Sequence, residues 1–186
     1  MVGKNNNKRA RQWVRALVGR KCVAVVGGWG SLLQLHFGPL RKMARPIDNA
    51  RLPDRMQTYE GAMVVFIENA AWRMIKDDRI VVGSNDNTAR SDISKMLAGM
   101  SGRGVRVARL TIPGAALTIQ LAGAVRIEVL PLESVLGVND ESYHLRLNDE
   151  WMSVLRGGRI VFAHRRDQGA GSPKRALRVV RRRGAD

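Results

Sequence analysis

The middle of this sequence, residues 22–163, alternates between short apolar runs and the residues that end them. Val, Ile and Leu fill the runs, and Gly, Pro, Asp and Asn separate them, which is typical of β-strands joined by turns. In the clearest run, Leu33, Leu35 and Phe37 alternate with Gln34 and His36, so the two sets would lie on opposite faces of a strand. We expect strands at residues 22–26, 32–37, 62–68, 72–75, 80–82, 105–112, 117–121, 125–130, 143–147, 151–155 and 159–163.

Local signals also predict how these strands are connected. The segment Lys76-Asp77-Asp78-Arg79 separates two runs and predicts a tight hairpin. A helix is expected to begin at Ser91 or Asp92, because both residue types cap helices, and to end at Gly99. Residues 39–61 are basic and contain proline, which predicts a loop.

The two halves of the chain show the same order of signals, which predicts an internal repeat. The matched positions are Leu17-Val18-Gly19 with Leu97-Ala98-Gly99, Val23 and Val25 with Val105 and Val107, Leu33, Leu35 and Phe37 with Leu117, Ile119 and Leu121, residues 64–67 with 125–129, and Trp72 with Tyr143. The expected fold is therefore α+β and mostly antiparallel β, with two degenerate helix-plus-sheet repeats of about 80 residues packed as one domain. We place the repeats at residues 22–96 and 97–163, between an N-terminal arm (1–21) and a C-terminal arm (164–186) that are basic and helical or disordered.

The succession of Leu-x-Gly, Val-x-Val and Leu33-Gln34-Leu35-His36-Phe37-Gly38 resembles small bacterial β-rich domains of uncharacterised function. The resemblance covers residues 17–155 and leaves both arms outside it. Its motifs are apolar and structural, so it implies a fold and no catalytic residue.

The formal net charge of +16 is almost confined to the two ends of the chain. Residues 1–21 hold seven basic side chains and no acidic one, residues 156–186 hold ten basic and two acidic ones, and residues 22–155 are nearly neutral. Basic segments of this kind bind polyanions by releasing counterions, whatever the rest of the chain does. The charge therefore predicts a class of partner and leaves the function of the middle open.

The N-terminal arm predicts an amphipathic helix that ends near Gly19, with Trp13 and Leu17 on its apolar face. Two interpretations stay open. Either Trp13 docks the helix on the domain and its cations are merely solvated, or the exposed cations contact phosphate groups. The phosphate-binding candidates are Lys8, Arg9, Arg11 and Arg15.

The C-terminal arm combines a linker with a basic amphipathic segment. Residues 167–172 have the composition of a flexible linker, and Ser172-Pro173 supplies a helix start. The helix would suit nucleic acid, an acidic protein or an anionic membrane surface, and a solvated disordered tail is the alternative. Its polyanion-binding candidates are Lys174, Arg175, Arg178, Arg181, Arg182 and Arg183.

The glycine-rich stretch Gly27-Gly28-Trp29-Gly30-Ser31 fits no nucleotide-binding template. It lacks Gly-Lys-Ser/Thr, and a strand rather than a helix is expected after it. We expect a turn between strands, where Trp29 either anchors a partner or packs back over the core.

No residue pattern predicts a catalytic site, a metal site or a cofactor. His36, His144 and His164 lack neighbours at metal-binding spacing, and His36 and His144 are expected on the solvent side of their strands. Cys22 is expected to be buried and free, which favours a reducing compartment such as the cytoplasm. No transmembrane segment is expected, because no apolar run approaches the ~18 residues that span a bilayer.

Three functions remain in contention. The leading hypothesis is a non-enzymatic protein whose basic arms bind DNA or RNA, or a nucleoprotein assembly, through phosphate contacts. The second is a bacterial protein-interaction module, such as an immunity or accessory protein, that binds an acidic protein partner. The third is an enzyme of unrecognised type, whose site would lie between the repeats and be lined by carboxylates or by His36 and His144.

Overall fold

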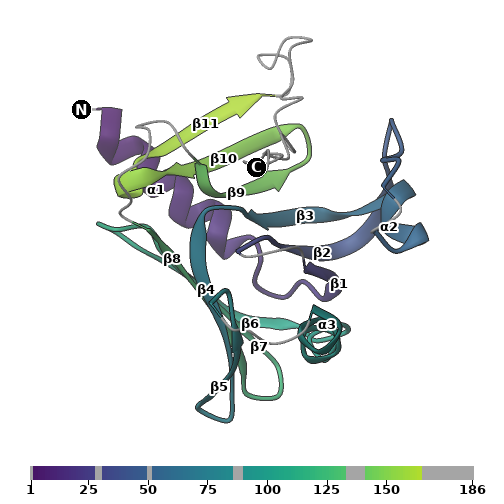
Figure 1. Cartoon of the computed structure of the whole chain (residues 1–186). Helices are drawn as coiled ribbons and strands as arrows, with labels where there is room; N and C mark the ends of the chain where they lie inside the picture. The colour runs from purple at the N-terminus through teal and green to yellow at the C-terminus, as the bar shows by residue number, and fades with distance from the viewer. Residues whose placement is uncertain (1, 28–30, 50–51, 86–89, 133–140, 165–186) are drawn as a thin grey trace, which may run out of the picture.

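The computed structural model describes residues 2–27, 31–49, 52–85, 90–132 and 141–164. Within these residues, eleven strands form two antiparallel sheets around one core (Figure 1). The six-stranded sheet has the order β1 (Cys22–Gly27), β2 (Leu33–Lys42), β3 (Tyr59–Ile67), β9 (Glu141–Leu147), β10 (Glu150–Leu155) and β11 (Ile160–His164). The five-stranded sheet has the order β5 (Arg79–Gly83), β4 (Ala70–Lys76), β8 (Val125–Pro131), β7 (Ala116–Leu121) and β6 (Val105–Thr111). The expectation of a mostly antiparallel β-rich fold is confirmed.

Each sheet combines strands from both halves of the chain. β1, β2 and β3 form a meander in the six-stranded sheet, and the chain then crosses to β4 and β5 in the other sheet. In the second half, β6, β7 and β8 form a meander in the five-stranded sheet, and the chain crosses back to β9, β10 and β11. Neither half therefore completes a sheet by itself.

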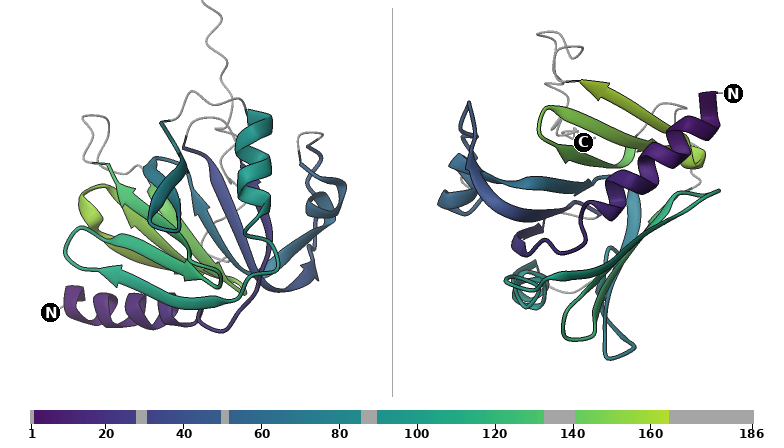
Figure 2. Two further views of the ribbon diagram at one scale, coloured as in Figure 1. Left: turned by 90° about the horizontal axis from the view of Figure 1, so that it is seen from below. Right: turned by 180° about the vertical axis from the view of Figure 1, so that it is seen from behind.

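Two helices contact the sheets at their edges (Figure 2). α1 (Val2–Arg15) packs on β6 and β11, and α3 (Arg90–Ala98) packs on β1 and β5. The expected apolar face of the N-terminal helix is observed, because Ala10, Trp13 and Val14 of α1, and Leu17 in the turn after it, are all buried in the core. α1 is thus an integral part of the domain.

The segment between residues 39 and 61 differs from the expected loop. β2 continues to Lys42 and pairs again with β3 from Leu40 onward, after a register shift between Phe37 and Leu40. Gly38, with φ of +77°, allows this bulge, because few other residues adopt that backbone conformation. A short helix, α2 (Asp54–Thr58), precedes β3.

The tight hairpin at residues 76–79 is confirmed. Lys76 pairs with Arg79, and the two central residues, Asp77 and Asp78, have φ of 49° and 59°. Positive φ at both central positions is the mark of a type I′ turn, whose twist matches that of the flanking strands.

Two buried side chains connect a strand of one sheet to the turn before a strand of the other sheet, each within one half of the chain. The Tyr143 hydroxyl in β9 donates a hydrogen bond of 2.6 Å to the carbonyl of Ala115, just before β7. The Trp72 indole in β4 donates one of 2.9 Å to the carbonyl of Ser31, just before β2. Both bonds satisfy a backbone acceptor.

Replacing Tyr143 with Phe should lower the free energy of unfolding by about 1–2 kcal/mol, because the buried Ala115 carbonyl would lose this donor. Urea unfolding of the full chain measures this. Tyr59→Phe is the matched control, because Tyr59 is 39% exposed, and it should change stability by less than about 0.5 kcal/mol. Equal effects of the two substitutions would contradict the role of the Tyr143 hydroxyl.

Candidate functional site

The exposed side of α1 carries a line of cations. Lys8, Arg11 and Arg15 are exposed and follow one another at spacings of three and four residues, so they lie on one face and line the same open hollow. At 1.5 Å per residue this line is roughly 10 Å long, the length of about three base-pair steps of duplex DNA. We call these three residues the basic face of α1.

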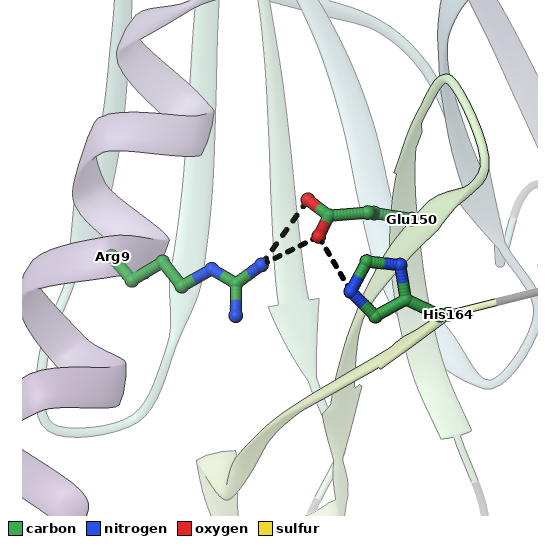
Figure 3. Close-up of polar contacts among 3 residues, drawn as sticks. All are labelled: Arg9, Glu150 and His164. Atoms are coloured by element: carbon green, nitrogen blue, oxygen red, sulfur yellow. Dashed lines mark hydrogen bonds and ion pairs between the residues drawn. The ribbon is translucent and has the colours of Figure 1, made fainter. Parts of the chain in front are cut away.

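Arg9, the fourth candidate on α1, is held against the domain (Figure 3). Its Nη2 lies 3.0 Å from Oε1 and 3.1 Å from Oε2 of Glu150, and its guanidinium lies 4.2 Å from the ring centre of Phe162. The sequence spacing already indicates that Arg9 faces the domain, because Arg9 is four residues before the buried Trp13 and therefore on the same side of the helix.

The same carboxylate connects α1 to the end of the described domain. His164 Nε2 lies 2.9 Å from Glu150 Oε1, the oxygen that Arg9 also contacts (Figure 3). The C-terminal arm therefore begins next to α1. Its six candidates, Lys174, Arg175, Arg178, Arg181, Arg182 and Arg183, lie outside the described residues, as does Trp29.

A second region of interest is a pocket on the outer face of the six-stranded sheet, the face that points away from the core between the sheets. The strand register brings two cross-strand rows of side chains together there. One row is His36, Val64, Arg146 and Trp151, and the other is Gln34, Phe66, His144 and Ser153. Residues of the β2–β3 connection cover these rows and leave a pocket of about 290 Å³, which we call the outer pocket. Its other lining residues are Met43, Ile47, Leu52, Met56, Tyr59, Glu60 and Glu68.

His36 is buried in this pocket, only 5% exposed, so the expectation of a solvent-side residue is wrong. The β2–β3 connection covers this strand face, which the alternation of residues alone predicts to be exposed to solvent. The Gly61 N–H donates a hydrogen bond of 3.2 Å to Nδ1, which places the ring proton on Nε2. Nε2 has no hydrogen-bond partner among the described residues. Burial, with the nearby Arg146 charge, lowers the pKa of His36 to about 4, so the ring is neutral at pH 7.

His144 lies between aromatic rings and beside a carboxylate. Its ring stacks on Phe66 with centroids 4.8 Å apart, and the Trp151 ring meets it edge-on at 4.6 Å. Its Nδ1 lies 3.4 Å from Glu141 Oε2, and this contact lowers the pKa of the Glu141 carboxyl. Burial raises the pKa of the neighbouring Glu68 carboxyl. His144 is thus only partly exposed, which also departs from the expectation of a solvent-side residue.

Arg146 is the cation of the outer pocket, and two partners constrain it. It forms an ion pair with Glu60, and its guanidinium lies 5.3 Å from the ring centre of Trp151. In the described part of the chain, no three His, Cys, Asp or Glu side chains converge closely enough to bind a metal ion. The pocket is therefore suited to hydrogen bonding and ring stacking with an organic ligand.

Cys22 is buried and free, as expected, and burial raises the pKa of its thiol to about 12. Within the described ranges, no helix is both long and apolar enough to cross a membrane.

Comparison of the chain with protein-family models, with curated proteins and with solved structures found no match.

The outer pocket residues Glu60, Glu68, Arg146 and Trp151 were not singled out by the sequence. His36 and His144 were noted only as residues that a site between the repeats would use, whereas the pocket lies on the outside of one sheet. Gln34 and His36 alternate with buried residues in β2, so they had to share a face with whichever polar residues β3 and β9 placed opposite.

The burial of His36 predicts a pH-dependent stability. An unfolded histidine takes up a proton near pH 6.5, and folded His36 does so near pH 4, so between these values the unfolded state binds more protons. The free energy of unfolding should therefore fall as the pH is lowered through this window, by about 3 kcal/mol from His36 alone. Urea unfolding at pH 7, 5.5 and 4 measures the decrease, and His36→Gln should reduce it.

His164→Gln is the control, because the His164 side chain is 62% exposed. This variant should keep the wild-type decrease. If His36→Gln also kept it, the account of His36 as a buried neutral ring would be wrong.

Proposed function

We propose that this protein binds nucleic acid through phosphate contacts made by the basic face of α1 together with the C-terminal arm. One observation carries the proposal: Lys8, Arg11 and Arg15 lie exposed on a helix whose opposite face is buried in the core. The chain also enters the C-terminal arm beside this helix, where His164 and Arg9 share Glu150. Both basic ends thus begin on the same side of the domain.

The composition of the helix favours phosphate contact over base stacking. Trp13, the only aromatic residue of α1, is 7% exposed and packs edge-on against Phe162. The exposed face of α1 carries no aromatic ring. Its cations can therefore contact the phosphate backbone of a nucleic acid, but no ring is present on which a base could stack. Binding should therefore depend strongly on salt and little on sequence.

Docking of α1 also reduces the entropic cost of binding. The apolar residues that hold the helix are already buried, so the line of cations exists before a partner arrives. A preformed surface loses less conformational freedom on binding than a disordered arm does. An acidic protein is the second candidate partner, because the same cations would attract carboxylates.

We also infer that the two halves are copies of one structural unit. The hydrogen-bond register supports this, because β1 and β6 each carry a register shift at their second residue, between Cys22 and Ala24 and between Val105 and Val107. The two bonds from Trp72 and Tyr143 also occupy corresponding places, each reaching the turn before the central strand of the meander.

The turns after the two helices refine the correspondence. Gly19 has φ of +82° and donates to the carbonyl of Val105, and Gly102 has φ of +81° and donates to the carbonyl of Cys22. Gly19 therefore corresponds to Gly102 rather than to Gly99, three residues later than the sequence comparison had it. The interleaved sheets explain why the two units would pack as one domain.

Neutralising the basic face should weaken binding and reduce its salt dependence. If about six phosphates are contacted in all, the slope of log affinity against log salt should be about −5, and replacing Lys8, Arg11 and Arg15 with Gln should make it shallower by about 2.7. Fluorescence anisotropy with a duplex DNA and a structured RNA, at several salt concentrations, measures both slopes. Deletion of residues 1–21 is unsuitable, because it would remove part of the core.

Lys76, Arg79 and Arg109 replaced with Gln form the matched control. All three are exposed on the five-stranded sheet, so the variant loses the same charge at a different place. It should keep nearly the wild-type slope. A basic-face variant that bound as tightly as the control, or a wild-type protein that bound neither nucleic acid, would refute the proposal.

A further inference from the structure

We propose that the outer pocket binds a nucleotide, with the base among the aromatic side chains and the phosphate at the cationic residues next to them. The inference goes beyond the function proposed above, because the outer pocket and the basic face of α1 have no residue in common. The base would come either from a free nucleotide or from one nucleotide of a single strand.

The outer face of the other sheet shows that the fold does not require this pocket. In the five-stranded sheet, Glu128 of β8 lies opposite Arg73 of β4, and the two form an ion pair of 2.7 Å. Arg126 adds a second contact of 2.9 Å to Glu128. Polar and charged side chains of this kind are usual on the face of an antiparallel sheet that points away from the core. The corresponding cross-strand pair in the six-stranded sheet is Phe66 with His144, stacked and covered.

The apolar part of the outer pocket fits a flat ring. Phe66, His144 and Trp151 form a cluster of rings on the sheet, and Met43, Leu52 and Met56 from the β2–β3 connection line the same space. Two further lining side chains, Ile47 and Tyr59, are 46% and 39% exposed although they are large and hydrophobic. A volume of about 290 Å³ lies at the low end of the range for small-molecule pockets, which suits a single ring system.

Polar groups in the outer pocket match the edge of a base. Nε2 of His36 carries a proton, is buried and has no partner among the described residues. A buried donor without a partner is costly, and a ring nitrogen or carbonyl oxygen of a base would satisfy it once the side chains that now cover Nε2 move aside to admit the base. Gln34 and the Glu68 carboxyl, which also line the pocket, offer acceptors for the amino and imino groups of a base.

A cationic hollow of about 430 Å³ adjoins the outer pocket. Arg41, Lys42 and Arg45, all exposed, line this hollow. It shares Met43, Ile47, Glu60 and Arg146 with the outer pocket, so the two spaces lie side by side. Glu60 and Asp149 are its acidic residues, and Glu60 is already paired with Arg146. A phosphate next to a stacked base would therefore meet a net positive surface.

Binding of nucleoside monophosphates and nucleosides to the full-length protein tests the proposal. At about 0.3 kcal/mol per non-hydrogen atom, a mononucleotide should bind with a Kd on the order of 10 µM. Isothermal titration with AMP, GMP, CMP and UMP, and with the matching nucleosides, measures this. The expected result is at least one nucleotide that binds in this range, with its nucleoside bound more weakly.

Two variants separate the base from the phosphate. His36→Leu should weaken nucleotide and nucleoside alike by tenfold or more, because both lose the Nε2 donor. Arg41, Lys42 and Arg45 replaced with Gln should weaken the nucleotide by tenfold or more and leave the nucleoside unchanged. This second variant alters only exposed residues, so it keeps the proposal testable if His36→Leu does not fold.

The controls are Gln120→Leu, an exposed change on the other sheet, and the basic-face variant of α1. Both should bind nucleotides as the wild type does, even if the α1 surface proves not to bind nucleic acid. Trinucleotides distinguish the source: equal affinity for mononucleotide and trinucleotide supports a free ligand, and a trinucleotide bound tenfold more tightly supports a single strand. Failure of all four nucleotides to bind below 1 mM would overturn the proposal, as would unchanged affinity in both pocket variants.

Discussion

The burial of apolar surface between two sheets that each contain strands of both halves is the constraint on which the rest of this structure depends. β1–β3 and β9–β11 form one sheet, and β4–β5 and β6–β8 form the other, so one core contains apolar residues of both halves. The helices α1 and α3 complete the same core at the sheet edges. Burial of this kind is the main favourable contribution to folding, and here it also fixes where the two proposed binding surfaces lie.

The basic face of α1 is a direct consequence. Because Ala10, Trp13 and Val14 hold one face of α1 in the core, the opposite face points to solvent, and it carries Lys8, Arg11 and Arg15. α1 is therefore packed at an edge of the domain as part of its core. Glu150 forms an ion pair with Arg9 on the domain side of α1, and the last described residue, His164, contacts the same carboxylate.

The outer pocket lies on the face of the six-stranded sheet that points away from the core. Strand alternation places His36 and Arg146 opposite the core residues, and the pairing of β2, β3 and β9 brings them into one row. The bulge after Phe37 lets β2 extend, and the connection that follows covers the row. In the five-stranded sheet, the equivalent face carries the ion pairs of Arg73, Arg126 and Glu128.

Much of the fold follows from local patterns, and the pocket does not. Each expected strand overlaps an observed one, and the buried face of α1 follows from its spacing, because periodicity is a property of neighbouring residues. The burial of His36 depends on a connection that covers the sheet from outside, and its row partner Arg146 lies 110 residues away in the sequence. Neighbouring residues do not indicate which distant strands will pair or in what register. The same holds for Glu150, which contacts both Arg9 of α1 and His164 of β11.

The central claim is that the basic face of α1, and not the sheets, meets the nucleic-acid backbone. The most direct test is a two-dimensional NMR titration of the ¹⁵N-labelled full chain with a short DNA duplex at low salt. The account predicts that the largest amide shifts fall on α1 and on the end of β11 next to His164, and that they disappear as salt is raised. Shifts confined to the five-stranded sheet, or shifts that persist at high salt, would contradict it.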